Sequence, residues 1–173
     1  MKNILNIKFI FIVSLIILAV ISRLIGFIPN FSPIAAIALF GAAYFPNKRD
    51  AFIVPIIAMF ISDLFIGLHP TMWAVYLSFA LTVLIGFNLR KKQTVVRIIT
   101  SSLLSSVLFF IVTNFAHFLF YFPHTLQGLT QCYIDAIPFF RNTVLGDLVY
   151  CGVLFGSYNL AAIKIKELKL QSI

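Results

Sequence analysis

Long apolar runs occupy most of this chain, and they constrain its fold more than any other feature of the sequence. Short polar breaks separate six of them, at residues 9–28, 33–45, 51–68, 72–89, 95–121 and 139–163. An α-helix needs about 20 mainly apolar residues to cross a hydrocarbon core of roughly 30 Å. The chain has 173 residues, 61% of them hydrophobic and 10% charged, which leaves no room for a soluble domain. We therefore expect an all-α, polytopic membrane bundle of six transmembrane helices, forming one integral membrane domain over residues 1–173.

Basic residues divide unequally between the two sides of this bundle. If the N-terminus is inside, the outer side holds only Arg23 and Arg141 of the 13 Lys and Arg residues. Because cytoplasmic segments of membrane proteins are enriched in Lys and Arg, we expect both termini in the cytoplasm and the protein in the inner (plasma) membrane. These topology signals account for the net charge of +8 without a nucleic-acid partner. The first run lacks a clear cleavage site, which favours a retained helix over a signal peptide.

Local signals mark several helix boundaries. Ser32 before Pro33 predicts an N-cap followed by a first-turn proline, and Asn47 with Asp50 resembles a capping box. Pro55 should bend the third helix. The second run is short, so it spans only where the bilayer thins or neighbouring helices cover its ends, and a re-entrant segment is the alternative.

Polar residues that are not topology signals gather in the outer loops and the outer halves of the helices, which predicts a pocket opening outward. Ionisable groups inside a membrane usually face protein or water and mark functional sites. The candidate substrate-binding residues are Asn30, Asp63, His69, Trp73, Asn114, His117, Tyr133, Arg141, Asn142 and Asp147.

Each candidate also has a structural interpretation. Asp147 could form an internal ion pair with Arg141, and Asp63 could be an interfacial carboxylate. Asn114 and His117 share one helix face with Tyr121 and could hold two helices together. Trp73 could belong to an aromatic belt at the membrane surface.

Catalytic and metal motifs are missing from the sequence. It has no HExxH or CxxC motif and no Walker motif, and the outer histidines lie far from the one Gly-Ser pair near the inner end of the last helix. We therefore expect no enzymatic activity, no metal site and no cofactor.

Small residues recur at helical spacing. Ala38 and Ala42 lie four residues apart in the second run, as do Ser101/Ser105 and Ser102/Ser106 in the fifth. Such faces let helices approach closely, either within the bundle or against a second membrane subunit.

Residues 28–69, IPNFSPIAAIALFGAAYFPNKRDAFIVPIIAMFISDLFIGLH, resemble the substrate-binding S components of energy-coupling factor (ECF) transporters. With WAVYLSFALTVLIG, SSLLSSVLFFIVTNF and AIPFFRNTVLGDL, the chain is more closely similar to a bacterial membrane family of unknown function thought to be related to them. The S-component resemblance implies a ligand held by the loops after helices 1, 3 and 5. It also implies an integral coupling subunit and ATPases as partners. S components often dock through an alanine pair on helix 1, whereas here that spacing falls on helix 2, and the early N-terminal His of the nickel and cobalt members is replaced by Met1-Lys2-Asn3.

These observations predict a component that captures a small molecule, such as a vitamin-like micronutrient, from the outer side and depends on an energising partner. The alternative is a membrane scaffold or assembly subunit of similar architecture with no transported ligand. In the first case we expect Arg141, Asn142 and Asp147 to form one wall of the pocket. A long loop over residues 122–138 would close it.

Overall fold

Residues 2–171 form six α-helices and one short 3₁₀ turn. The computed structural model describes the backbone of residues 2–171 and the side chains of residues 10–163. The helices are α1 (Lys2–Leu24), α2 (Ile34–Tyr44), α3 (Lys48–Ile66), α4 (Met72–Gly86), α5 (Val95–Tyr121) and α6 (Leu126–Gln171), and a 3₁₀ turn, η1 (Phe87–Arg90), extends α4. Residues 2–171 contain no strand, which confirms the all-α class.

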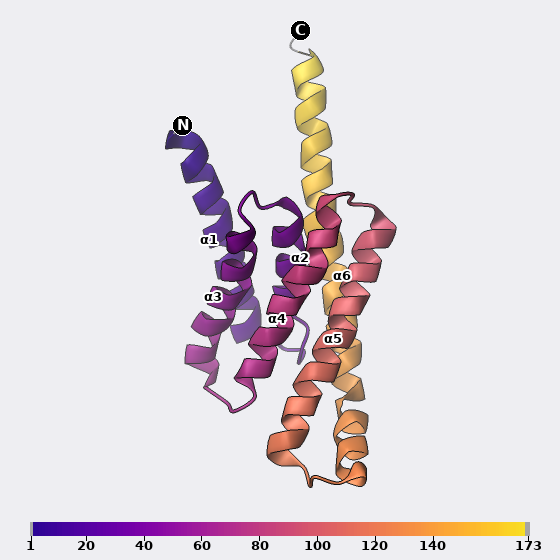
Figure 1. Cartoon of the computed structure of the whole chain (residues 1–173). Coiled ribbons are helices and arrows are strands. Elements are labelled where there is room, and N and C mark those ends of the chain that lie inside the picture. The colour runs from indigo at the N-terminus through magenta and orange to yellow at the C-terminus, as the bar shows by residue number, and fades with distance from the viewer. Residues whose placement is uncertain (1, 172–173) are drawn as a thin grey trace.

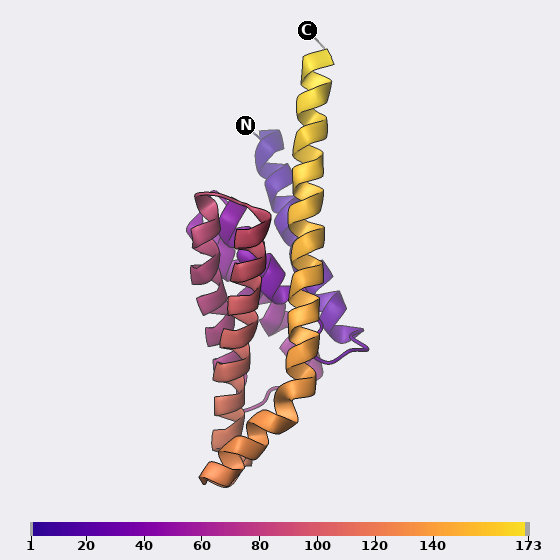
Figure 2. The same cartoon turned by 90° about the vertical axis from the view of Figure 1, so that its right-hand side faces the viewer.

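Successive helices run in opposite directions (Figures 1 and 2). Both termini and the turns after α2 and α4 lie at one end of the bundle, which we call the terminus end. The connections at 25–33, 67–71 and 122–125 lie at the opposite end, the loop end. This alternation brings the basic turns beside the termini.

The short helix α2 is covered by its neighbours, with α3, α4 and α6 packed against it. Every residue of the segment Ile34–Ala42 is buried. The sequence explains this position, because a helix that is apolar all round belongs in a core. The helix runs from the loop end toward the terminus end, and its 11 residues make it the shortest of the described α-helices (Figure 1).

The arrangement of α2 decides the role of its small residues. Ala38 and Ala42 are both 0% exposed. A Cβ built on Gly86 of α4 would lie 2.6 Å from the Ala42 methyl group, so the two helices touch at this point. The alanine pair therefore packs inside the bundle, which is the first of the two alternatives that its spacing left open.

The C-terminus of α2 is capped by a distant side chain. Arg90 donates from Nε to the Ala42 carbonyl at 2.7 Å and from Nη2 to the Phe45 carbonyl at 2.7 Å. These bonds satisfy carbonyls that a helix end leaves without intrahelical partners, and a cation is favourable there.

Two predicted N-caps differ from the structure. Pro33 itself occupies the N-cap position of α2, and no side chain caps that helix. Asn47 is the N-cap residue of α3, but its side chain bonds the Asp50 carboxylate at 3.4 Å instead of a backbone N–H. Pro55 lies inside α3, as predicted.

The predicted loop over residues 122–138 is wrong, because α6 begins at Leu126. Thr125 caps it by accepting a hydrogen bond from Gly128 N at 3.1 Å. The segment looked like a loop because it is polar, but its polar residues support a helix, as when Gln131 donates to Asp135 four residues later at 2.7 Å. Pro138 falls inside α6, where the helix bends (Figure 2).

Among the residues whose side chains the structure describes, 10–163, three helical segments are long and apolar enough to cross a membrane: Met72–Arg90, Val95–Tyr121 and Leu126–Ile163. Large apolar side chains are exposed around the exterior of the bundle, including Phe65 at 72% exposure and Leu160 at 70%. An apolar exterior of this kind is compatible with insertion in a membrane.

Candidate functional site

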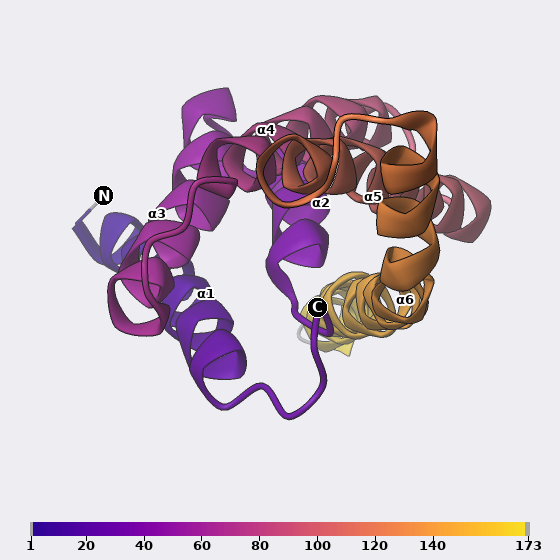
Figure 3. The ribbon, with the colours of Figure 1, turned by 90° about the horizontal axis from the view of Figure 1, so that it is seen from below.

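A cavity of about 590 Å³ lies at the loop end, and residues from all six described helices line it. All three connections at that end, which Figure 3 shows from below, contribute residues to its wall. Its polar lining residues are Ser22, Arg23, Asn30, Ser32, His69, Thr71, Thr113, Asn114, His117, Cys132, Asp135, Thr143 and Asp147. The volume is in the range of sites that bind small molecules.

The connection between α1 and α2 forms one side of this cavity. Asn30 has a φ of 60°, a left-handed conformation that asparagine tolerates better than most residues and that helps the chain turn into α2. Asn142 of α6 donates to the Pro29 carbonyl at 3.1 Å. The Phe31 ring packs on that of Tyr150 with centroids 5.5 Å apart. These contacts fasten the connection to α6.

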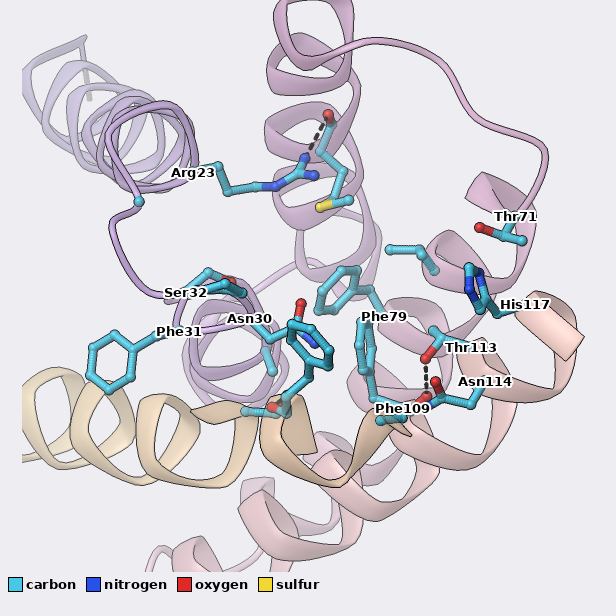
Figure 4. Close-up of a pocket in the computed structure, with 18 of the residues that line it drawn as sticks. Arg23, Asn30, Phe31, Ser32, Thr71, Phe79, Phe109, Thr113, Asn114 and His117 are labelled. Carbon is cyan, nitrogen blue, oxygen red and sulfur yellow. Dashed lines mark hydrogen bonds between the residues drawn. The ribbon is translucent and has the colours of Figure 1, made fainter. Parts of the chain in front are cut away.

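A charged network joins α1 to α3 beside the cavity. Arg23 Nη1 lies 2.7 Å from Asp63 Oδ1 and also donates to the Ser62 hydroxyl. The Tyr76 hydroxyl donates to Asp63 Oδ2 at 2.8 Å. Figure 4 shows Arg23 reaching from α1 toward the chain of α3. Asp63 is 1% exposed, so its charge is neutralised and hydrogen-bonded behind the cavity wall.

Helix α5 supplies a polar and aromatic wall. The Asn114 side-chain NH₂ donates to the Phe110 carbonyl at 2.7 Å. One turn further, His117 stacks on Tyr121 with ring centroids 4.5 Å apart. Deeper in the cavity, Phe109 packs against Phe79 of α4 at 5.4 Å (Figure 4). The cavity therefore has a flat aromatic lining beside a few fixed polar groups.

Helix α6 contributes the acidic residues of the lining. Asp147 is 4% exposed, and its Oδ2 accepts a hydrogen bond from Ser106 of α5 at 2.6 Å. Asp135, one turn before the Pro138 bend, is exposed. The small serines of α5 permit the close approach that joins Asp147 to Ser106.

Five of the ten residues predicted from sequence line the cavity: Asn30, His69, Asn114, His117 and Asp147. His69 is fixed by a contact of 2.9 Å between its Nδ1 and Thr71 Oγ1.

The other five do not line it. Asp63 pairs with Arg23, Trp73 is 50% exposed, and Arg141 is also exposed. Tyr133 donates to the Ile111 carbonyl at 2.7 Å, while Asn142 holds the connection described above. Of the predicted wall of Arg141, Asn142 and Asp147, only Asp147 therefore lines the cavity.

Sequence reasoning left Arg23 and Asp135 out of the site, although both line the cavity. Arg23 had a detectable signal, because an outer cation near the end of the first helix is a natural partner for an acid near the outer end of the third. Asp135 was assigned to a loop, and no local pattern placed it against α5.

The comparisons with known proteins identify the family without giving a function. No curated protein and no solved structure matches the chain. Residues 3–169 match the family model DUF6580, described as a family of unknown function. The chain thus belongs to DUF6580.

Proposed function

We propose that this protein is a non-enzymatic substrate-capture component for a small molecule that enters from the outer side of the cell's plasma membrane. In this proposal all six helices cross the membrane and both termini are cytoplasmic. Uptake depends on an energising partner, namely an integral coupling subunit with ATPases, as the resemblance to ECF S components implies.

The observation that carries the proposal is the cavity of about 590 Å³ at the loop end. The basic turns lie with the termini at the opposite end, so the positive-inside rule supports an orientation in which the cavity faces outward. The polar groups on its wall also support a binding site. Hydrogen bonds hold the side chains of Asn114 and His69 in fixed positions there, as binding a ligand in one orientation would need.

The test fills the cavity and asks whether a ligand is lost. Thr113 lines the cavity on α5, and its hydroxyl donates to the Phe109 carbonyl at 2.7 Å. Thr100 lies on the same helix with the same kind of bond, to the Val96 carbonyl at 3.0 Å, but is exposed outside the cavity. Thr113→Trp should block a ligand, and Thr100→Trp is the matched control.

Each protein is purified in mild detergent from the native membrane, and co-purifying small molecules are identified by untargeted mass spectrometry. We expect one compound to accompany the wild type and Thr100→Trp and to be absent from Thr113→Trp. If no compound distinguishes wild type from Thr113→Trp and both retain wild-type melting, the proposal is refuted and the scaffold alternative is favoured.

A further inference from the structure

We infer that the cavity recognises an organic cation, a small molecule with an ammonium-type group and an apolar body, and that Asp147 is the residue that pairs with the charge. This inference rests on the proposed function and specifies the class of its ligand.

The charges around the cavity are not balanced. Among the side chains that the structure describes, the one salt bridge joins Arg23 to Asp63. The Arg23 cation is therefore already matched by an acid behind the wall. Asp135 and Asp147 also line the cavity, with no Lys or second Arg among the lining residues to offset them. In a chain with net charge +8, this cavity is locally acidic.

Asp147 is the acid placed for recognition. It is 4% exposed, and Ser106 bonds only Oδ2, so Oδ1 has no hydrogen-bond partner among the described residues. A carboxylate at membrane depth without a countercharge is unfavourable. The Ser106 hydroxyl stabilises the charged carboxylate from one side, and a cation entering the cavity would supply the missing partner on the other.

Aromatic rings decide between an organic and an inorganic cation. Phe79, Phe109 and Phe139 line the same cavity as Asp147. The faces of aromatic rings attract alkylammonium groups and provide apolar contact for the rest of such a ligand. A hydrated metal ion would instead need several oxygen ligands around it.

The experiment compares three probes with the same phenyl body and different charge: 2-phenylethylammonium, neutral 2-phenylethanol and anionic 3-phenylpropanoate. Binding is measured by calorimetry on the full chain in nanodiscs of phosphatidylcholine, with empty nanodiscs subtracted. We expect the ammonium probe to bind about tenfold more tightly than either other probe, as one charge-assisted contact would give.

Asp147→Asn should remove this preference and leave binding of 2-phenylethanol unchanged. The matched control is Asp50→Asn, since Asp50 lies on α3 outside the cavity lining, and it should keep the preference. The comparison of probes on wild-type protein needs no variant, so the inference can be tested even if Asp147→Asn does not fold.

The inference is overturned if the ammonium probe does not bind, if the neutral or anionic probe binds as tightly, or if the preference survives Asp147→Asn. Its failure can be separated from failure of the proposed function. If Thr113→Trp removes a co-purified compound that is neutral or anionic, the capture function stands and cation recognition falls.

Discussion

The ion pair between Arg23 and Asp63 should stabilise the bundle mainly by preventing an uncompensated buried charge. Their atoms are 2.7 Å apart, and the side-chain exposures are 18% for Arg23 and 1% for Asp63. Replacing Arg23 by Met keeps most of the apolar stem but leaves the Asp63 carboxylate with the Tyr76 hydroxyl as its remaining side-chain donor. Removing one partner of a buried ion pair lowers the free energy of unfolding by about 3–5 kcal/mol. Because the Tyr76 hydrogen bond is retained, we expect a loss of about 3 kcal/mol for Arg23→Met.

Neutralising the acid as well should recover much of this loss. Asn at position 63 can still accept the Tyr76 hydrogen bond without burying a charge. We therefore expect the free energy of unfolding of the double variant Arg23→Met/Asp63→Asn to be only about 1–2 kcal/mol below that of the wild type. Arg49, an exposed cation on α3, provides the control, and Arg49→Met should change stability by less than about 0.5 kcal/mol.

The assay is reversible unfolding in mixed micelles of dodecyl maltoside and sodium dodecyl sulfate, followed by far-ultraviolet circular dichroism. The reasoning is refuted if Arg23→Met is no less stable than Arg49→Met. It is equally refuted if the double variant is less stable than Arg23→Met alone, because Asp63 would then not be the source of the cost.

Three further expectations concern helix packing and topology. Gly86→Ala should destabilise the bundle by about 1–3 kcal/mol, because the new Cβ would lie 2.6 Å from a methyl group of α2, whereas Gly152→Ala, which meets nothing within 4 Å, should be neutral or stabilising in the same unfolding assay. Arg90→Ala should lower the free energy of unfolding by about 1.5–3 kcal/mol, because it removes two hydrogen bonds to carbonyls at the end of α2. Lys91→Ala, at an exposed position, is the control, and equal stability of the two variants would contradict the capping role. In intact cells, an impermeant thiol reagent should label Gln127→Cys at the loop end and not Lys91→Cys at the terminus end, once both native cysteines are replaced by serine. The opposite labelling would invert the proposed orientation.

Much of the helical framework could be predicted from sequence, because apolar periodicity and helix boundaries are local properties of the chain. The run at 95–121 coincides with α5, whose N-cap Thr94 accepts a hydrogen bond from Arg97 N at 3.4 Å. The buried position of α2 also follows from its sequence, because a helix that is apolar on all faces is stable only where other groups cover it. The error at 122–138 has a local origin too: polarity was taken as a sign of a loop, although that stretch has the i, i+4 pairing of a helix.

The candidate site depended on contacts between residues far apart in the chain, which a single sequence does not specify. Arg23 meets Asp63 across 40 residues and Ser106 meets Asp147 across 41, and in each case the face that a helix turns to its neighbour selects the partner. Sequence reasoning placed Asp147 in the wall of an outward pocket beside Arg141, its neighbour in sequence, with an ion pair between the two as the structural alternative. The close fit of small residues, as between Ala42 and Gly86, sets how the helices pack. The sequence by itself thus determined most of the helical segments, because apolar runs are local. The tertiary structure decided which acid was neutralised and which was left facing the cavity, because that choice depends on helix packing and not on distance along the chain.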